Sequence, residues 1–330
     1  MIAPSMNALA EARNLPAWSS WRDGVPPAGW YRLPMTHAAA DFYRDNGFLV
    51  IEDALSLHEV DELRAETLAI CRAERGALGG VTTPEPHESD DDVMRRYLCI
   101  HFPHKISAVM ERALSHPGIV ETLTRTVSPN VKCMQSMLFI KAAGKPGQAW
   151  HQDEIYIPTR DRSLTGGWIA LDDATVENGC LWVIPGSHRP GVLYMQAEHH
   201  DRRFDCAWEA QRFPYSNDDA VPVEVKAGSI VFFNGYLLHR SLPNYASSGY
   251  RRSLVNHYMS AESFLPWFGN QLPEGQHVAI GDNRDIIIIA GEDPYAFKGI
   301  EQRNGPHVRP SGEGGCGHQE RNEEANNKES

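Results

Sequence analysis

The chain has 330 residues, of which 42% are hydrophobic and 22% are charged, a balance typical of a globular protein. Its formal net charge of −12 argues against nucleic-acid binding through a basic face, although a few local arginines can still attract an anionic substrate. The longest strongly apolar run, residues 286–290, is far too short to span a bilayer, so we expect no membrane partner.

Cysteine usage points to a reducing compartment. No two cysteines are spaced as CxxC, and three of them lie in apolar runs, which predicts reduced core thiols rather than a disulfide frame or a zinc knuckle. The first residues lack a basic stretch followed by an apolar one, so no signal peptide is expected. Together these features favour a cytoplasmic protein.

The first third of the chain is predicted to be mostly helical. Residues 1–35 are rich in Pro, Trp and Ala with little periodicity, and we expect an irregular arm there. Thr36 is a candidate N-cap for a short helix that stops at Gly47, and residues 48–51 are expected to form a short strand.

A capping box, Ser56-x-x-Glu59, opens an amphipathic helix that we expect to reach Gly76. Residues 79–92 are acidic and rich in Pro and Gly, which predicts a loop, either an ordinary solvated one or a mobile lid. Two further helical stretches are expected near residues 105–114 and 117–127.

The pattern changes from residue 131 onward, where short apolar runs alternate with turn signals such as KPG, ENG, PGS and KAG. Such regular punctuation predicts an antiparallel sandwich or barrel, braced by the preceding helices on one face. We expect a single domain over residues 36–308 and a disordered polar tail over residues 309–330. The predicted strands are 132–141, 167–172, 180–184, 222–226, 229–233, 236–241 and 251–259.

His151-Gln152-Asp153 is the sharpest local motif. Side chains two residues apart point to the same face of a strand, so an imidazole and a carboxylate could occupy adjacent positions on one metal ion. A two-histidine-one-carboxylate site needs a second imidazole and leaves open positions for other ligands. HxD alone is a common chance match, however, and a loop histidine bonded to its own neighbour is the simpler interpretation.

His239 is the preferred second histidine, with His188 and His257 as competitors. Only His239 is followed by an arginine pair, Arg251 and Arg252, at the start of the next predicted strand. A hairpin between the two strands would place an arginine across from the metal, where its planar guanidinium could hold the far carboxylate of 2-oxoglutarate.

Ser241 would face the same side as His239 and could donate its hydroxyl to that carboxylate. One of the two arginines is expected to form a solvated salt bridge instead.

Five linked segments resemble the phytanoyl-CoA dioxygenase family, especially its phytanoyl-CoA dioxygenase domain-containing branch. The resemblance covers about residues 36–260 in the right order. The segments are QSMLFIK (135–141), WHQDEIYI (150–157), WIALDDATVENGCLWVIPGSH (168–188), LLHRSLPN (237–244) and RRSLVNHY (251–258).

The resemblance implies a mainly β protein with a double-stranded β-helix (jelly-roll, cupin-like) core that uses Fe(II), 2-oxoglutarate and O2. Position by position, it implies that the metal ligands are His151, Asp153 and His239 and that the 2-oxoglutarate residues are Arg251, Ser241, Trp168 and Met137.

The segment between His239 and the arginine pair is one residue longer than is usual in the family, so Arg252 stays an alternative to Arg251. Because Asp153 is present, where halogenases of the family have a small residue, the resemblance favours hydroxylation or a related oxidation with release of succinate and CO2.

The substrate is expected to be a small organic molecule. Basic residues of a long insertion, residues 190–220, would favour an acidic one if they faced the site, but solvated charges are the simpler interpretation. Further candidates for the lining of the site are Gln152, Tyr156, Arg160, Arg162 and Trp182. The insertion's basic candidates are His199, His200, Arg202 and Arg203.

Two rival functions remain at this point: a cupin-like binding or sensor protein without turnover, and a metal-dependent hydrolase or isomerase on the same barrel.

Overall fold

The structure is a computed structural model that describes residues 36–76, 78, 83–205, 208–265 and 284–310. The arm expected over residues 1–35 lies outside this part, as does most of the expected tail. Among the described residues, no helix is both long enough and apolar enough to cross a membrane.

The helices gather in the first third of the chain, as predicted. They are α2 (His37–Asn46), α3 (Leu57–Cys71), α4 (Asp90–Met94), α5 (Ala108–Leu114) and α6 (Pro117–Thr126).

Their ends follow capping chemistry. Thr36 accepts a hydrogen bond from the Ala39 amide at the start of α2, and Gly47 ends this helix with a left-handed φ of 81°. Both halves of the Ser56–Glu59 capping box form at the start of α3.

One helix prediction and one loop prediction need correction. α3 ends at Cys71 rather than near Gly76, because the chain turns back there and Ala73 takes a left-handed φ of 59°. The acidic run within residues 79–92 is not loop throughout: Ser89 caps α4, whose first turn holds the three aspartates from Asp90 to Asp92. Carboxylates are favourable at that end of a helix because they face its unpaired N–H groups.

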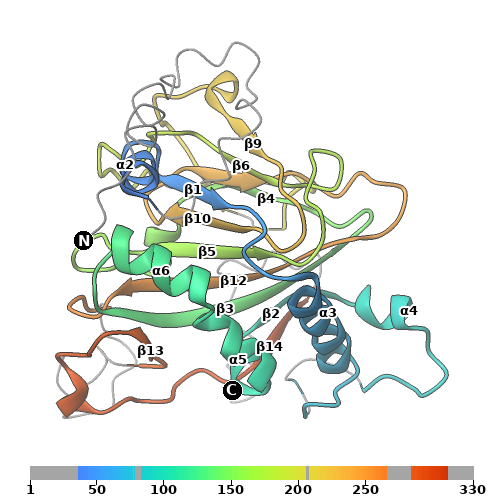
Figure 1. The fold of residues 1–330 in the computed structure, drawn as a ribbon. Helices are drawn as coiled ribbons and strands as arrows, with labels where there is room; N and C mark the ends of the chain where they lie inside the picture. The colour runs from blue at the N-terminus through green and yellow to red at the C-terminus, as the bar shows by residue number, and fades with distance from the viewer. Residues whose placement is uncertain (1–35, 77, 79–82, 206–207, 266–283, 311–330) are drawn as a thin grey trace, which may run out of the picture.

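Two antiparallel sheets form the body of the protein (Figure 1). The large sheet has the order β1-β10-β5-β12-β3-β2-β14, with β13 also paired to β3, and the small sheet has the order β4-β11-β6-β9. The large sheet consists of β1 (Phe48–Ile51), β2 (Tyr97–His101), β3 (Val131–Ala142), β5 (Thr165–Ala170), β10 (Ile230–Asn234), β12 (Tyr250–Ser260), β13 (Ile287–Ala290) and β14 (His307–Pro310). The small sheet consists of β4 (Gln148–His151), β6 (Leu181–Val183), β9 (Val221–Val223) and β11 (His239–Ser241).

A separate hairpin, β7 (Gln196–Glu198) with β8 (Trp208–Ala210), forms within the insertion. The strand β14 includes Arg309 and Pro310, so ordered structure continues past the expected end of the domain at residue 308.

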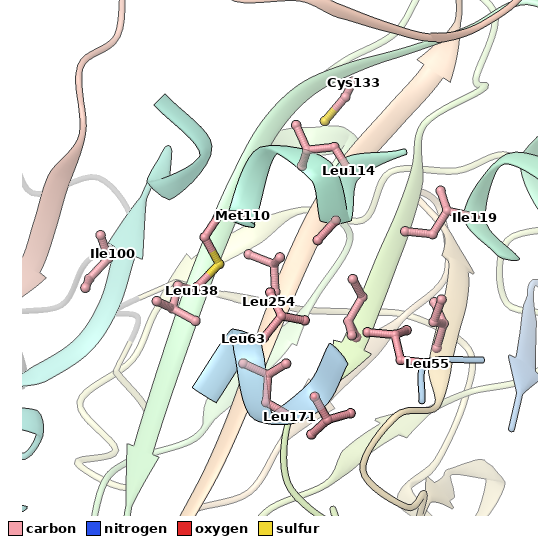
Figure 2. Packing of buried hydrophobic residues seen from close by; sticks show 14 of the residues in the cluster. Leu55, Leu63, Ile100, Met110, Leu114, Ile119, Cys133, Leu138, Leu171 and Leu254 are labelled. Atoms are coloured by element: carbon pink, nitrogen blue, oxygen red, sulfur yellow. The ribbon is translucent and has the colours of Figure 1, made fainter. Parts of the chain in front are cut away.

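Alternation along the strands explains the layers. On β12, Leu254 packs in a cluster with Leu63 of α3 and Met110 of α5, whereas Val255 packs in a second cluster with Leu181 and Val183 of the small sheet. Figure 2 shows the first cluster, in which helix side chains meet those of β3 and β12. The large sheet is therefore covered by helices on one face and by the small sheet on the other, which is the helix-braced jelly roll that was expected.

Candidate active site

A cavity of about 330 Å³ lies between the inner faces of the two sheets. The strands β2, β3, β5, β12 and β14 of the large sheet line it, facing β4, β6 and β11 of the small sheet. All three candidate metal ligands and the preferred arginine, Arg251, reach this one space. Met137, Trp168 and Ser241, the other residues that the sequence associates with 2-oxoglutarate, also line it.

His151 and His239 lie directly opposite each other in the pairing of β4 with β11, with ring centroids 4.1 Å apart. In each ring Nδ1 lies next to the backbone carbonyl two residues earlier, 2.7 Å from Ala149 O and 2.9 Å from Leu237 O. Because a carbonyl only accepts, Nδ1 must carry the proton, and Nε2 keeps its lone pair. Burial, followed by the charge of its neighbour His239, lowers the pKa of His151 to about 4, so this imidazole is neutral at pH 7.

The HxD pattern suggested that His151 and Asp153 share a strand, but they do not. β4 ends at His151, and Asp153 begins a short 3-10 turn, Asp153–Ile155. The turn still brings its Oδ1 to 3.7 Å from Nε2 of His151 and 3.6 Å from Nε2 of His239. Burial opposes ionisation of Asp153, but the surrounding imidazoles, first His239 and then His257, hold its pKa below the usual value.

The three side chains are suited to holding a metal ion. One ligand atom from each of His151, Asp153 and His239 lies within 4.8 Å of the others. Two neutral imidazoles and one carboxylate are the donor set of non-heme iron(II) sites with open positions. The chemistry of these donors therefore fits Fe(II).

The competing histidines have other environments. His257, on β12, points its Nε2 at the outer oxygen of Asp153, Oδ2, at 3.1 Å, so it contacts the candidate ligand rather than replacing it. His188 lies outside the cavity and contacts the carbonyl of Arg44 through Nε2 at 2.9 Å. It packs so closely on Gly47 that a Cβ there would lie 2.4 Å from its ring.

Arg251 is a buried cation at the edge of the same cavity. Its side chain is 4% exposed, Nη1 donates to Ser253 Oγ at 2.9 Å, and the guanidinium lies 5.5 Å from the centre of the Trp168 ring. Its Nε is buried without a hydrogen-bond partner, and no ion pair is present for it among the described residues. Burial lowers its pKa to about 10, which leaves it charged at pH 7. A buried cation without an ion pair is suited to binding an anionic ligand, because buried charges are normally paired.

The route by which Arg251 reaches the site differs from the prediction. β11 and β12 do not form a hairpin, because β11 pairs with β4 and β6 while β12 pairs with β3 and β5. Arg251 therefore faces the metal ligands across the gap between the sheets. Arg252 points to the other face of β12, where its Nε and Nη2 each lie 2.8 Å from an oxygen of Asp172. One of the pair thus forms a salt bridge, as expected, but this salt bridge is largely buried and not solvated.

Sequence reasoning overlooked Lys141, a residue of β3 that is 2% exposed. Its Nζ donates to Ser241 Oγ at 3.0 Å and to the Leu242 carbonyl at 2.8 Å. Burial, with the charge of Arg251 as the next cause, lowers its pKa well below the usual value. The only sequence signal was its position at the end of the apolar run 132–141, where a charged residue is expected to face solvent.

The cavity wall formed by β2, β3 and β14 carries a second polar group that sequence reasoning also overlooked: His101, Gln135 and Arg309. His101 stacks on His307 of β14 at 4.7 Å between ring centres. Arg309 pairs with Asp205 at 2.7 Å, which ties β14 to the insertion.

Most of the other lining candidates lie elsewhere. Tyr156 lines the cavity, but Gln152 bonds to the carbonyls of Val192 and Tyr236 outside it. No basic residue of the insertion is among the residues that line the cavity, and Arg203 pairs with Asp201 at 2.6 Å. The residues found outside the cavity lining are Gln152, Arg160, Arg162, Trp182, His199, His200, Arg202 and Arg203.

Solved structures share this fold. The non-heme monooxygenase ThoJ in its apo form superimposes with a TM-score of 0.58 at 20% identity, covering 80% of this chain and 88% of ThoJ. EvdO2 from Micromonospora carbonacea var. aurantiaca, solved with 2-oxoglutarate, gives a TM-score of 0.51 at 21% identity, covering 69% and 92%. At these identities the likeness establishes the fold.

Curated relatives are similar in sequence. Phytanoyl-CoA dioxygenase 1 of Oryza sativa subsp. japonica is 28% identical over 284 residues, which span 76% of this chain and 98% of that protein. Phytanoyl-CoA dioxygenase domain-containing protein 1 of Danio rerio is 31% identical over 166 residues, or 49% of this chain and 57% of that protein.

The jelly roll, the His-Asp-His centre and these relatives together define a 2-oxoglutarate-dependent dioxygenase that uses Fe(II). The sequence profile described as phytanoyl-CoA dioxygenase (PhyH) matches residues 43–253, well over half of the chain. The chain belongs to the phytanoyl-CoA dioxygenase family.

Proposed function

We propose that this dioxygenase holds Fe(II) with His151, Asp153 and His239, and anchors the far carboxylate of 2-oxoglutarate with Arg251, to hydroxylate a small polar molecule. The observation that carries the proposal is Arg251, a buried cation without an ion pair in the described chain, which faces the same cavity as the three ligands. A hydrolase or isomerase would have no use for such a group.

The chemistry that Fe(II) and 2-oxoglutarate supply at such a site is the activation of O2 to oxidise a C–H bond, with succinate and CO2 as co-products. The protein's part is geometric. The Nδ1 contacts of His151 and His239 keep both Nε2 lone pairs turned toward a common point. Arg251 offers a planar fork that matches a carboxylate, and Trp168 and Met137 complete an apolar surface beside it.

The spacing of the residues along β12 is more than long enough for one co-substrate together with the side chains that would hold it. Arg251 and His257 are six positions apart on the cavity face, and His257 touches Asp153. Six residues of strand span roughly 20 Å. This leaves room for 2-oxoglutarate to reach from the metal ligands to Arg251, with substrate on the side of His101 and Gln135.

Substrate size follows from the cavity. A volume of about 330 Å³ lies at the small end of ligand pockets, which run from roughly 300 to 1,000 Å³, and 2-oxoglutarate takes part of it. His101, Gln135, Tyr156 and Arg309 give the remaining space polar walls. These features favour a compact substrate that carries some polar groups over a long acyl chain enclosed in the cavity.

The test is succinate release under air from the Fe(II)-loaded protein with 2-oxoglutarate, screened over small acids and natural-product scaffolds. We expect one class of compound to stimulate succinate release and to gain one oxygen atom, and Asp153→Ala to abolish both. Substrate oxidation that persists in Asp153→Ala would refute the ligand set. A protein that binds Fe(II) but never releases succinate would be the sensor, and turnover without 2-oxoglutarate would indicate the hydrolase or isomerase.

Two coarser features belong to the same proposal. We infer a cytoplasmic location, because the four described cysteines, Cys71, Cys99, Cys133 and Cys180, are all unpaired and buried. We also assign the whole activity to one domain that begins at residue 36, because both sheets contribute to a single cavity.

A further inference from the structure

Lys141 links the two sheets behind the candidate 2-oxoglutarate site. It lies directly opposite Arg251 in the pairing of β3 with β12, in the large sheet. Nζ of Lys141 reaches across to the segment that carries Ser241. The three groups that surround Nζ all act as hydrogen-bond acceptors. They are Ser241 Oγ at 3.0 Å, the Leu242 carbonyl at 2.8 Å and the Gly179 carbonyl at 3.4 Å.

Ser241 Oγ already accepts two hydrogen bonds, so its hydroxyl can still only donate its proton. A hydroxyl has two acceptor positions and one proton to donate. Nζ of Lys141 and the backbone N–H of Gln148, at 3.2 Å, both donate to Ser241 Oγ and fill the acceptor positions. No acceptor for its proton is present among the described residues, and Ser241 lines the cavity. The proton is therefore available to a ligand.

The charge state of Lys141 decides whether this holds. An ammonium group has three N–H donors, which matches its three acceptors, whereas a neutral amine would take the Ser241 proton on its lone pair. Burial and the charge of Arg251 both lower the pKa of Lys141 and so disfavour its ammonium form. A carboxylate bound beside Arg251 acts in the opposite direction, because its negative charge stabilises both cations.

We propose that Lys141 is a positioning residue that turns the Ser241 hydroxyl into a donor to the far carboxylate of 2-oxoglutarate, and thereby makes the site select a dicarboxylate 2-oxo acid. The inference rests on the proposed function. It assigns the selectivity to three groups, Arg251, Ser241 and Lys141, of which Lys141 acts through Ser241.

A purely structural role is the alternative, since the Nζ contacts with Leu242 and Gly179 also fasten the small sheet to β3. β3 offers a matched control. Lys132 belongs to the same strand, is 0% exposed and donates to the Ala261 carbonyl at 3.0 Å, but it does not line the cavity. Lys132→Met and Lys141→Met both remove a buried amino group from β3, and only the second should alter co-substrate choice.

The experiment measures the binding of 2-oxoglutarate and of 2-oxobutyrate, which has the same 2-oxo acid head but no far carboxylate. Calorimetry on the Fe(II)-loaded protein without O2 gives both dissociation constants. We expect the preference for 2-oxoglutarate to fall by roughly 10- to 100-fold in Lys141→Met, the loss of one charge-assisted hydrogen bond, with 2-oxobutyrate binding little changed. Ser241→Ala should show the same loss, and Lys141→Met should add little in a Ser241→Ala background.

The other possible outcomes either overturn the inference about Lys141 alone or overturn the proposed function as well. A preference that survives Lys141→Met or Ser241→Ala, or one that falls equally in Lys132→Met, overturns this inference and leaves the proposed function standing. Full additivity of the two changes shows that Lys141 does not act through Ser241 and also overturns it. A wild-type protein without preference for 2-oxoglutarate overturns both the inference and the proposed function. Should Lys141→Met fail to fold, Lys141→Gln takes its place in both backgrounds, and a preference that survives it overturns the inference in the same way.

Discussion

Nε2 of His257 lies 3.1 Å from Oδ2 of Asp153, while the other oxygen of the same carboxylate faces His151 and His239. Oδ2 of Asp153 thus contacts His257, while Oδ1 faces the candidate metal position. Since a carboxylate oxygen only accepts, Nε2 of His257 must carry the proton. This contact fixes the orientation of the one ligand that comes from a turn instead of a strand.

His257→Phe should therefore weaken Fe(II) binding by roughly 10- to 100-fold, the usual effect of removing the partner of a metal ligand. His257→Gln, which keeps a donor amide, should recover part of the affinity. Equilibrium titration with Fe(II) under anaerobic conditions measures both. Equal affinity in wild type and His257→Phe would show that Asp153 needs no support from β12.

Arg251→Met should raise the KM for 2-oxoglutarate by at least about tenfold, because a charge-assisted bidentate contact is lost. Arg252→Met removes a neighbouring guanidinium that is bound to Asp172 on the outer face of the sheet. It should lower the melting temperature without a comparable change in KM. Succinate formation against 2-oxoglutarate concentration tests the pair, and the reverse pattern would assign the role to Arg252.

Leu254→Ala should destabilise the protein by about 2–5 kcal/mol, because the side chain is 0% exposed and lies among helix and sheet residues in the core (Figure 2). Leu254 points away from the cavity, so Fe(II) binding by the folded protein should be unchanged. Urea unfolding gives the first quantity and metal titration the second. A cost below about 1 kcal/mol would mean that the helices do not pack tightly on β12.

Acid should destabilise the protein partly through His104. Burial, and next the charge of Lys105, lowers the pKa of this imidazole to about 4, whereas an unfolded histidine titrates near 6.5. Between these values only the unfolded state takes up the proton, so stability falls as pH drops from about 6.5 to about 4, by roughly 2–3 kcal/mol in total. His104→Gln cannot titrate and should show a shallower loss. Urea unfolding across this range compares the two, and parallel curves would contradict the assignment.

Local signals predicted the elements well where the chemistry is local. Thr36, Gly47 and the Ser56–Glu59 box act on the adjacent backbone, and each marks a helix end in the structure. The strands β3, β10 and β12 lie within a few residues of their predicted bounds, because each alternates between two buried layers. β2, β13 and β14 were not predicted.

The candidate site was predicted by a combination of motif, order and resemblance, but its geometry was not. The expected hairpin from His239 to Arg251 is wrong, because the turn after β11 carries the chain from the small sheet to the large one. Neither Lys141 nor Arg309 could be assigned from the sequence, because a buried lysine or arginine is identifiable only once its acceptors are placed around it. Strand pairing between distant parts of the chain decides where Arg251 lies and which groups surround Lys141 and Arg309. No local sequence pattern encodes that pairing.

The metal ligands and Ser241 belong to one sheet or its adjoining turn, whereas Arg251 belongs to the other. A molecule held at one end by the ligands' metal and at the other by Arg251 would act as a strut that resists separation of the layers. Binding of this molecule would then help to hold the two sheets together, in addition to its part in the chemistry. Release of that molecule after each turnover would remove one connection between the two layers.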